Sequence, residues 1–498
     1  MENVSLVPDK AATNVRALHW AGFAGVVVLV LVTSGIPLPA IAVVTLGVTG
    51  MGTLVLTWLG IGRHAAELPV RRLYGIAASW CLPLLVARPL FSGDIHSYLA
   101  QGVIAAKGLD AYLLGPAAAL GADSPVTQQV SHYWQDTPAP YGPAFVTLSR
   151  TIAHLAGENL LATVLLHRLV EVAGVVLLAW ALPRLARRVG VSPSIALWLA
   201  LLNPLVLWHV VGGVHNDGLM VGLMVAGVEL VLMGASRAGA ARPALIAAGV
   251  VVVGVAANVK IVAVAALCFV GVDLFRRARP AGRIAVAVGL PAGFAAVTVA
   301  ISAGSGLGFG WVRALAGVSG QVHSWLAPTN ELGFLVGGLG KLAGFDLTDS
   351  AITVFSAIGA ILGLLAGARL LWLTYREKLH PLLGAGLAFG AMLVFGPVVQ
   401  PWYLLWMVAL LAVSLTTDRA RWILAGVSSV FALLLPPAGG GVVALVLGYL
   451  LAAVLLVGTL LLLRKKRVAL VEKQLWELAT DYPPVLVRTG AGRDDFRG

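Results

Sequence analysis

The chain has 498 residues, of which 59% are hydrophobic and only 11% are charged, and its formal net charge is +12. Soluble domains carry about 25% charged residues, so this composition excludes an ordinary soluble protein and predicts an all-α polytopic membrane protein. The basic residues fall in short clusters between apolar runs, which is the distribution of a membrane protein and argues against a nucleic-acid partner.

Apolar runs of roughly 17 to 25 residues mark the predicted membrane helices. They begin near residues 17, 40, 73, 160, 193, 217, 243, 259, 284, 350, 381, 403, 422 and 440, so about fourteen spans, and at least twelve, are expected within residues 1–463. Residues 464–498 start with a basic cluster and are expected to form an amphipathic helix on the inner leaflet and a disordered tail, both cytoplasmic.

Charge predicts the orientation, because cytoplasmic loops of membrane proteins are rich in lysine and arginine. With a cytoplasmic N-terminus, the basic clusters all fall on the cytoplasmic side, and the long polar segments 91–143 and 304–349 both fall outside. We therefore expect a multi-pass protein of the plasma membrane with both termini cytoplasmic. The clusters are Arg63/Arg71/Arg72, Arg184/Arg187/Arg188, Arg237/Arg242, Arg276/Arg277/Arg279/Arg283, Arg376/Lys378, Arg419/Arg421 and Arg464–Arg467.

The segment 91–143 is the longest polar interruption of the chain, and it is the first place where chemistry is expected. Helical spacing puts Asp94, Ser97, Tyr98 and Gln101 on one face of a helix that would rest on the membrane surface. A carboxylate held there could take a proton from an attacking hydroxyl as a general base. The alternative is that Asp94 caps the N-terminus of that helix, and the two roles can coexist.

A tight turn with the sequence GGVHNDG joins two predicted spans at the external side. It places His215, Asn216 and Asp217 between glycines, where they could approach a sugar or a phosphate closely. The alternative is that Asn216 or Asp217 caps the next helix.

Two charged groups within predicted spans are candidates for function. Lys260 has no carboxylate beside it in sequence, and its ammonium would suit a phosphate; the alternative is that it extends to the outer interface. Arg168 and Glu171, three residues apart and next to His167, are expected to neutralise each other, with phosphate binding by Arg168 as the alternative.

Aromatic side chains gather in the predicted external segments. Interfacial aromatic belts are common, and stacking on sugars or contact with a prenyl chain is the alternative. The candidates are Trp134 and Tyr141 in the first long segment, Trp325 beside His323 in the second, and Trp402 with Tyr403 at the start of a later helix.

Neither a metal site nor a nucleotide site is expected. Cys81 and Cys268 both lie in apolar runs, so a disulfide or a cysteine-based metal site is not predicted. Asp94 has no acidic neighbour, which predicts no metal cofactor, although a divalent metal remains open if Asp94 and Asp217 converge in space. The cytoplasmic connections are short and lack a glycine-rich nucleotide-binding pattern.

The stretches FSGDIHSYLAQG, TPAPYGP, NPLVLWHVVGGVHNDGLM, NVK and QPWYLLW resemble the actinobacterial polyprenyl-phosphate-mannose-dependent alpha-1,6-mannopyranosyltransferases. The resemblance covers roughly residues 70–410. It implies a membrane glycosyltransferase fold of the C type, an external site, a polyprenyl-phosphate-mannose donor, a mannosylated phosphatidylinositol or lipomannan acceptor, and inversion at the sugar carbon. It also implies elongation of the mannan backbone of lipomannan and lipoarabinomannan, with the shorter chain and the GDI tripeptide favouring the distal of two related roles.

The resemblance assigns the acidic catalytic role to Asp94. His96 stands where the family usually has tyrosine, so no role is carried over to that position. The donor phosphate is expected near Lys260, Arg168 and His323. The substrate-binding residues are expected among Tyr98, Gln101, Trp134, Tyr141, His215, Asn216, Asp217, Trp325, Trp402 and Tyr403.

Two other functions fit parts of the same pattern. A transporter or flippase of a lipid-linked sugar would also have many spans and an intramembrane lysine. The polar residues gather on one side, however, and no convincing internal repeat is present. A transferase of another prenyl-linked sugar, such as arabinofuranose, remains a second alternative.

Overall fold

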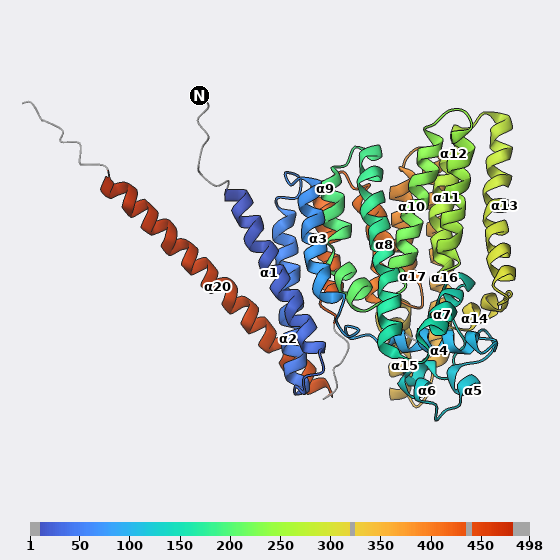
Figure 1. Cartoon of the computed structure of the whole chain (residues 1–498), viewed down its shortest axis with the longest axis horizontal. Helices are drawn as coiled ribbons and strands as arrows, with labels where there is room; N and C mark the ends of the chain where they lie inside the picture. The colour runs from blue at the N-terminus through green and yellow to red at the C-terminus, as the bar shows by residue number, and fades with distance from the viewer. Residues whose placement is uncertain (1–9, 319–323, 435–440, 482–498) are drawn as a thin grey trace, which may run out of the picture.

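The computed structural model describes residues 10–318, 324–434 and 441–481, and the side chains within 13–318, 324–434 and 441–466. Every regular element in these ranges is a helix, and most of the helices run side by side in one bundle (Figure 1). This confirms the prediction of an all-α polytopic membrane protein.

Seven helices are long and apolar enough to cross a membrane, and a bent helix pair brings the candidates to eight. The predicted fourteen spans are therefore not all matched by helices of spanning length. The long helices are α1 (Lys10–Thr33), α2 (Ala40–Gly62), α8 (Leu160–Val189), α10 (Asp217–Ala235), α13 (Pro280–Gly304), α16 (Thr348–Tyr375) and α20 (Gly441–Asp481).

Six shorter helices run in the bundle among the long ones (Figure 1). They are α3 (Val70–Leu84), α11 (Ala241–Ala257), α12 (Val264–Arg277), α17 (Pro381–Phe395), α18 (Leu404–Ala412) and α19 (Asp418–Ala432). The helix α20 continues without a break to Asp481, past the predicted domain boundary at residue 463, so the surface helix and tail beyond it stay a prediction.

One end of the bundle is covered by short helices and loops. The segment 91–143 contributes most of this layer, and the later segment 304–349 adds to it (Figure 1, bottom). The helices are α4 (Asp94–Ala106), α5 (Pro116–Leu120), α6 (Pro125–Gln129), η1 (His132–Trp134), α7 (Pro143–Ala156), α14 (Gly310–Val318) and α15 (Pro328–Leu342).

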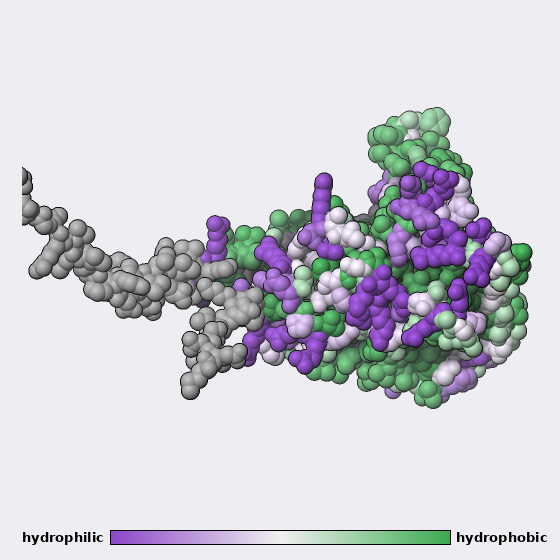
Figure 2. Space-filling view, turned by 90° about the horizontal axis from the view of Figure 1, so that it is seen from above, coloured by the Kyte–Doolittle hydropathy of each residue, from purple (hydrophilic) through white to green (hydrophobic). Residues whose placement is uncertain are grey.

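The opposite end carries the basic clusters. The start of α1 and the far end of α20 both lie there (Figure 1). Seen from this end, hydrophilic side chains gather across the face, while hydrophobic ones flank it (Figure 2). Arg188 and Glu229 form a bidentate ion pair at 2.7 Å in this region. The polar catalytic candidates and the basic clusters thus lie at opposite ends, as the sequence predicts.

Glycines let α8 and α10 approach closely. A Cβ on Gly174 would lie 2.3 Å from the Gly218 carbonyl oxygen, and a Cβ on Gly222 would lie 2.3 Å from the Gly174 carbonyl oxygen. Small residues spaced four apart allow such backbone contact between membrane helices. This contact fixes the start of α10, which carries Asp217, against α8.

A broken helix leads to the GGVHNDG turn. The pair formed by α9 (Pro193–Ala196) with η2 (Leu197–Leu201) and by η3 (Val206–Gly212) is bent by 59°. At the break, the Asn203 side chain accepts a hydrogen bond from the Leu205 amide and donates to the Leu199 carbonyl. Val214 then adopts φ = +59°, a strained value for a β-branched residue, and this turn aims His215 at the segment 91–143.

Candidate active site

A cavity of about 390 Å³ lies at the end of the bundle that α4 and α7 cover. Six predicted site residues from distant parts of the chain line it, which supports their assignment to one site. They are Asp94, Trp134, Tyr141, Lys260, Trp402 and Tyr403.

Asp94 is held by the GGVHNDG turn. The first helical residue of α4 is Asp94, and its Oδ2 lies 3.1 Å from Nδ1 of the buried His215. His215 stacks on Trp402, with ring centroids 3.6 Å apart. The Asp94 carboxylate is still 30% exposed and faces the cavity. The N-cap position of α4 is occupied by Gly93, and the Asp94 carboxylate pairs with His215, a geometry that favours the general-base interpretation over the capping one.

The pKa of Asp94 is lower than that of an ordinary aspartate. Burial raises this pKa, but the His215 imidazole and the Lys260 ammonium together outweigh burial and lower it. Because α4 is not one of the candidate spans, its carboxylate lies in the covering layer. Asp94 is therefore ionised at neutral pH and can accept a proton.

Asp217 holds Lys260 at the wall of the cavity. The Lys260 ammonium donates to Asp217 Oδ2 at 2.5 Å, and the Trp406 indole donates to Asp217 Oδ1 at 2.7 Å. The ammonium also lies over the rings of Tyr403 and Tyr141, 4.9 and 5.8 Å from their centroids. Lys260 therefore lines the cavity and is paired with a buried carboxylate.

Neither Asn216 nor Asp217 caps α10 with its side chain. Glu171 of α8 takes that role and accepts a hydrogen bond from the Leu219 amide at 2.9 Å. The Asn216 amide group is fully buried, and its two polar atoms have no partner in the described protein. Buried polar groups normally have a partner, so Asn216 remains a candidate for contact with a polar ligand.

Tyr98 and Gln101 lie behind the cavity wall. Both are buried on α4. The Tyr98 hydroxyl accepts a hydrogen bond from the Asn216 backbone amide at 3.3 Å, and its ring packs edge-on against Tyr141. These contacts tie α4 to the turn, so Tyr98 positions the site rather than lining it.

Two other predicted residues, Arg168 and Trp325, lie away from the cavity lining, and a third cannot be placed. Arg168 does not pair with Glu171 as expected; its guanidinium donates to the carbonyls of Leu85, Val211 and Gly212. Trp325 is 62% exposed and does not line the cavity. His323 lies outside the residues that the structure describes.

Several residues that the sequence did not assign to the site contribute to it. Gln400 and Trp311 line the cavity, and Trp406 binds Asp217. His209 lies behind His215, and it also contacts Trp402. The stretch QPWYLLW contains two of these residues, Gln400 and Trp406. The polar side chain of Gln400, directly before a proline in an apolar region, was the signal that could have marked it as a site residue. Within the described ranges, no three His, Cys, Asp or Glu side chains form a group that could hold a metal ion.

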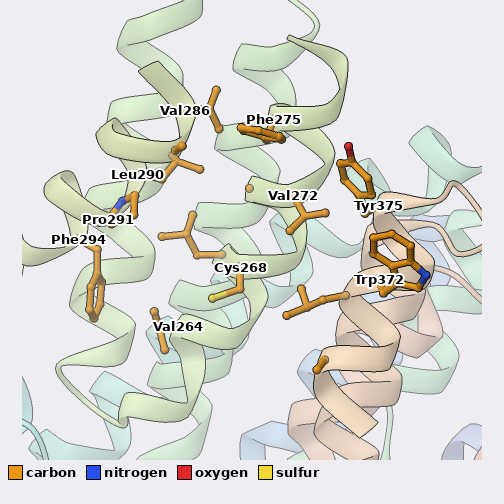
Figure 3. A pocket seen from close by; sticks show the side chains of 15 residues that line it. Val264, Cys268, Val272, Phe275, Val286, Leu290, Pro291, Phe294, Trp372 and Tyr375 are labelled. Atoms are coloured by element: carbon orange, nitrogen blue, oxygen red, sulfur yellow. The ribbon is translucent and has the colours of Figure 1, made fainter. Parts of the chain in front are cut away.

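An apolar groove of about 690 Å³ runs along α12, bounded by α13 and α16 (Figure 3). It extends from Val264 at the start of α12 to Phe275 and Tyr375 near the opposite end of the bundle. Val264 follows directly after η4 (Ile261–Ala263), which contributes Ile261 and Val262 to the cavity lining. The start of the groove is thus four residues along the chain from Lys260.

Comparison with known proteins identifies the family. The family description "Alpha-(1->6)-mannopyranosyltransferase, N-terminal domain" matches residues 13–276, and "MptB C-terminal domain" matches residues 329–472. A probable alpha-(1->6)-mannopyranosyltransferase of Mycolicibacterium smegmatis is 37% identical over 418 residues, which cover 79% of this chain and 74% of that protein. No solved structure matches the chain.

Two relatives from Mycobacterium tuberculosis agree with this result. Alpha-(1->6)-mannopyranosyltransferase Rv1459c is 37% identical over 440 residues, covering 78% of this chain and 73% of the relative. Alpha-(1->6)-mannopyranosyltransferase A is 36% identical over 393 residues, which cover 76% of this chain and 73% of the relative. These matches favour a mannosyltransferase over the transporter and the arabinofuranosyl alternatives. The chain therefore belongs to the alpha-(1->6)-mannopyranosyltransferase family, and it is a multi-pass membrane glycosyltransferase.

Proposed function

We propose that this mannosyltransferase takes mannose from a polyprenyl-phosphate carrier and adds it to a lipid-linked alpha-1,6-mannan on the external face of the plasma membrane. The observation that carries the proposal is one cavity lined by both an ionised carboxylate, Asp94, and an ammonium group, Lys260. A double displacement at the sugar carbon needs a nucleophile on the protein, whereas a single displacement needs a base for the acceptor and a cation for the leaving phosphate.

The reaction is a single displacement with inversion. Asp94 takes the proton of the acceptor 6-hydroxyl, and the resulting oxygen attacks the mannose C1 carbon from the face opposite the phosphate. The electrons of the breaking C1–O bond pass to the phosphate, whose growing charge Lys260 stabilises. His215 and Trp402 keep Asp94 in place while it receives the proton.

Lys260 can bind the phosphate without leaving Asp217. An ammonium group has three donors, and one of them is used by Asp217. The other two are free for oxygens in the cavity, where Gln400 adds an amide. Asp217 therefore orients Lys260, in the same way that His215 orients Asp94.

The apolar groove along α12 supports a lipid-linked donor. None of the fifteen residues that line the groove is charged (Figure 3). Its first residue, Val264, follows η4, which contributes to the cavity lining. An isoprenoid chain attached to a phosphate at Lys260 would enter the groove at Val264 and follow α12 across the membrane.

Aromatic residues at the cavity supply surfaces for the mannose units of the acceptor. Trp134 and Tyr141 come from the segment 91–143 of the covering layer, and Trp402 comes from the start of a helix in the bundle. Sugar rings have apolar faces that pack on aromatic rings, so these side chains would hold an extended mannan chain while its terminal residue meets Asp94.

The external orientation rests on the distribution of charge. The basic clusters lie at the end of the bundle away from the cavity, and loops rich in arginine are normally cytoplasmic. In this orientation the six shorter helices would complete the fourteen predicted crossings, and both termini would be cytoplasmic.

The test is mannosyl transfer by the purified full chain from a synthetic polyprenyl-phosphate-mannose to a short alpha-1,6-mannoside. Asp94→Asn keeps the shape of the side chain but removes the base, and it should lower the rate by roughly 10²–10⁴-fold. Asp136→Asn is the matched control, because Asp136 is an exposed acid of the same segment outside the cavity, and it should transfer normally. Equal activity of Asp94→Asn and wild type would refute the assignment of the base.

A further inference from the structure

The helix α13 stands away from the rest of the bundle. It is 25 residues long, yet Ser302 is its only fully buried residue, and it forms the right edge of the molecule in Figure 1. A gap lies on each side of it. The groove along α12 is one gap; a second cavity, of about 1030 Å³, lies between α11, α12 and α13.

Arginines surround the second cavity at the end of the bundle opposite Asp94. Arg242 lies in the first turn of α11, Arg277 ends α12, and Arg279 precedes α13, and all three line the cavity. Arg277 is paired with Asp273 at 2.8 Å. Arg242 and Arg279 are exposed and form no ion pair with the described residues. The mouth of the cavity therefore carries two uncompensated positive charges.

The interior of the same cavity is apolar, and one of its walls is made mostly of small residues. Its α13 wall consists largely of glycine and alanine, and a Cβ added to Gly289 would meet no atom within 4 Å. The lining extends along α13 from Arg279 to Val297, which is about 27 Å at 1.5 Å per residue and most of the hydrocarbon thickness of a bilayer. A chain of methylene groups fits such a space, because the helices themselves do not close it.

We propose that this cavity is a binding site for an anionic phospholipid, separate from the mannose-transfer site. The phosphate of the lipid binds Arg242 and Arg279, and one acyl chain lies against Gly289 between α11, α12 and α13. Anionic lipids are attracted to uncompensated arginines at the membrane surface, whereas a zwitterionic headgroup brings no net charge. The proposal does not depend on the donor or acceptor of the transfer reaction, since the mouth lies at the other end of the bundle from Asp94 and Lys260.

The test is phospholipid retention by the purified full-length protein after delipidation and re-addition of phosphatidylglycerol or phosphatidylcholine, read by native mass spectrometry. Arg242→Gln/Arg279→Gln removes the headgroup contacts and should weaken phosphatidylglycerol binding at least tenfold. Arg63→Gln/Arg419→Gln removes the same charge from exposed arginines outside the cavity and should bind as wild type does.

A second pair of variants tests the acyl-chain position. Gly289→Leu puts a bulky side chain into the cavity at a position where a Cβ meets no atom within 4 Å, so it should also weaken binding at least tenfold. Gly304→Leu places the same side chain on the same helix in open space outside the cavity and should leave binding unchanged. Equal binding of phosphatidylcholine by wild type, equal losses in the control variants, or full binding by the cavity variants would each overturn the proposal.

Discussion

Lys260 and Asp217 form an ion pair at 2.5 Å, although 43 residues separate them in the chain. Asp217 is fully buried, and Trp406 binds its second oxygen. Because an unpaired charge in this position is costly, each partner stabilises the charge of the other. The pair therefore has two functions that can be separated: it holds α10 against the start of η4, and it presents an ammonium group to the cavity.

A double variant separates these two functions. Asp217→Asn leaves Lys260 without its counter-ion, and breaking a buried pair costs about 3–5 kcal/mol, so a clear fall in apparent Tm is expected. Lys260→Met/Asp217→Asn removes both charges and should regain most of the lost stability, while mannosyl transfer stays low because the phosphate has no cation. Thermal unfolding and transfer assays of the same preparations check this. Wild-type transfer by the double variant would show that Lys260 does not bind the donor phosphate.

The low pKa of Asp94 predicts the acid limb of the pH profile. Asp94 acts as a base only when it is ionised. The usual pKa of an aspartate is near 3.9. The pKa of Asp94 is lower than this, so its carboxylate stays ionised at mildly acidic pH. Activity that depends on this group should therefore persist as pH falls from 7 to about 5 and disappear only near or below pH 4.

His215→Gln should move that acid limb. The change removes a contributor that lowers the pKa of Asp94 and leaves burial, which raises it, so the limb should shift to higher pH. Profiles of kcat/KM against pH for wild type and His215→Gln provide the measurement, because they report the groups of the free enzyme. An unshifted limb would mean that a different group titrates in the rate-limiting step.

Trp402 is expected to affect the transfer rate indirectly, because it holds His215 in place. The two rings stack at 3.6 Å, and His215 in turn contacts Asp94. Trp402→Ala should lower transfer by roughly 10–100-fold, because small displacements of a catalytic group are costly. Trp325→Ala is the control, since Trp325 is exposed and lies outside the cavity. If both variants lose the same activity, the loss reflects a general need for aromatic residues near the membrane surface. The stack of Trp402 on His215 is then not specifically required.

Local sequence patterns predicted the parts of the site but not how they meet. The polar segment 91–143 and the GGVHNDG turn were recognisable, because polar residues are rare in this chain and both lie between apolar runs. The bonds from His215 to Asp94 and from Lys260 to Asp217 join residues 121 and 43 positions apart. Such contacts depend on how the helices pack, and a single sequence contains no direct signal for that.

The interpretation of Arg168 shows the same limit. Helical spacing predicted a pair with Glu171, but partners from other helices compete more effectively. The broken helix exposes carbonyls to Arg168, and the start of α10 offers free amides to Glu171. The lengths of the helices were also beyond the sequence: fourteen apolar runs predict fourteen spans, but only seven or eight described helices reach spanning length, since an apolar run does not fix where a helix begins or breaks.

Because α8 and α10 pack closely, one added methyl group at their contact is expected to destabilise the protein. Gly222→Ala places a Cβ 2.3 Å from the Gly174 carbonyl oxygen, so the helices must separate. Overpacking of this kind costs about 1–3 kcal/mol, and it should lower the apparent Tm and reduce transfer by shifting Asp217. Gly426→Ala, which meets no atom within 4 Å, should have no adverse effect. Thermal unfolding of the two variants decides the matter; unchanged stability of Gly222→Ala would contradict the close contact.

The orientation is tested by labelling single cysteines in intact cells. In a background with Cys81→Ala and Cys268→Ala, Asp123→Cys lies in the covering layer and Ala238→Cys lies between α10 and α11 at the basic end; both positions are exposed. A membrane-impermeant maleimide should label Asp123→Cys in intact cells and Ala238→Cys only after lysis, because arginine-rich loops stay in the cytoplasm. The reverse pattern would place the cavity inside the cell. A lipid-linked donor would then have to be available on the cytoplasmic leaflet.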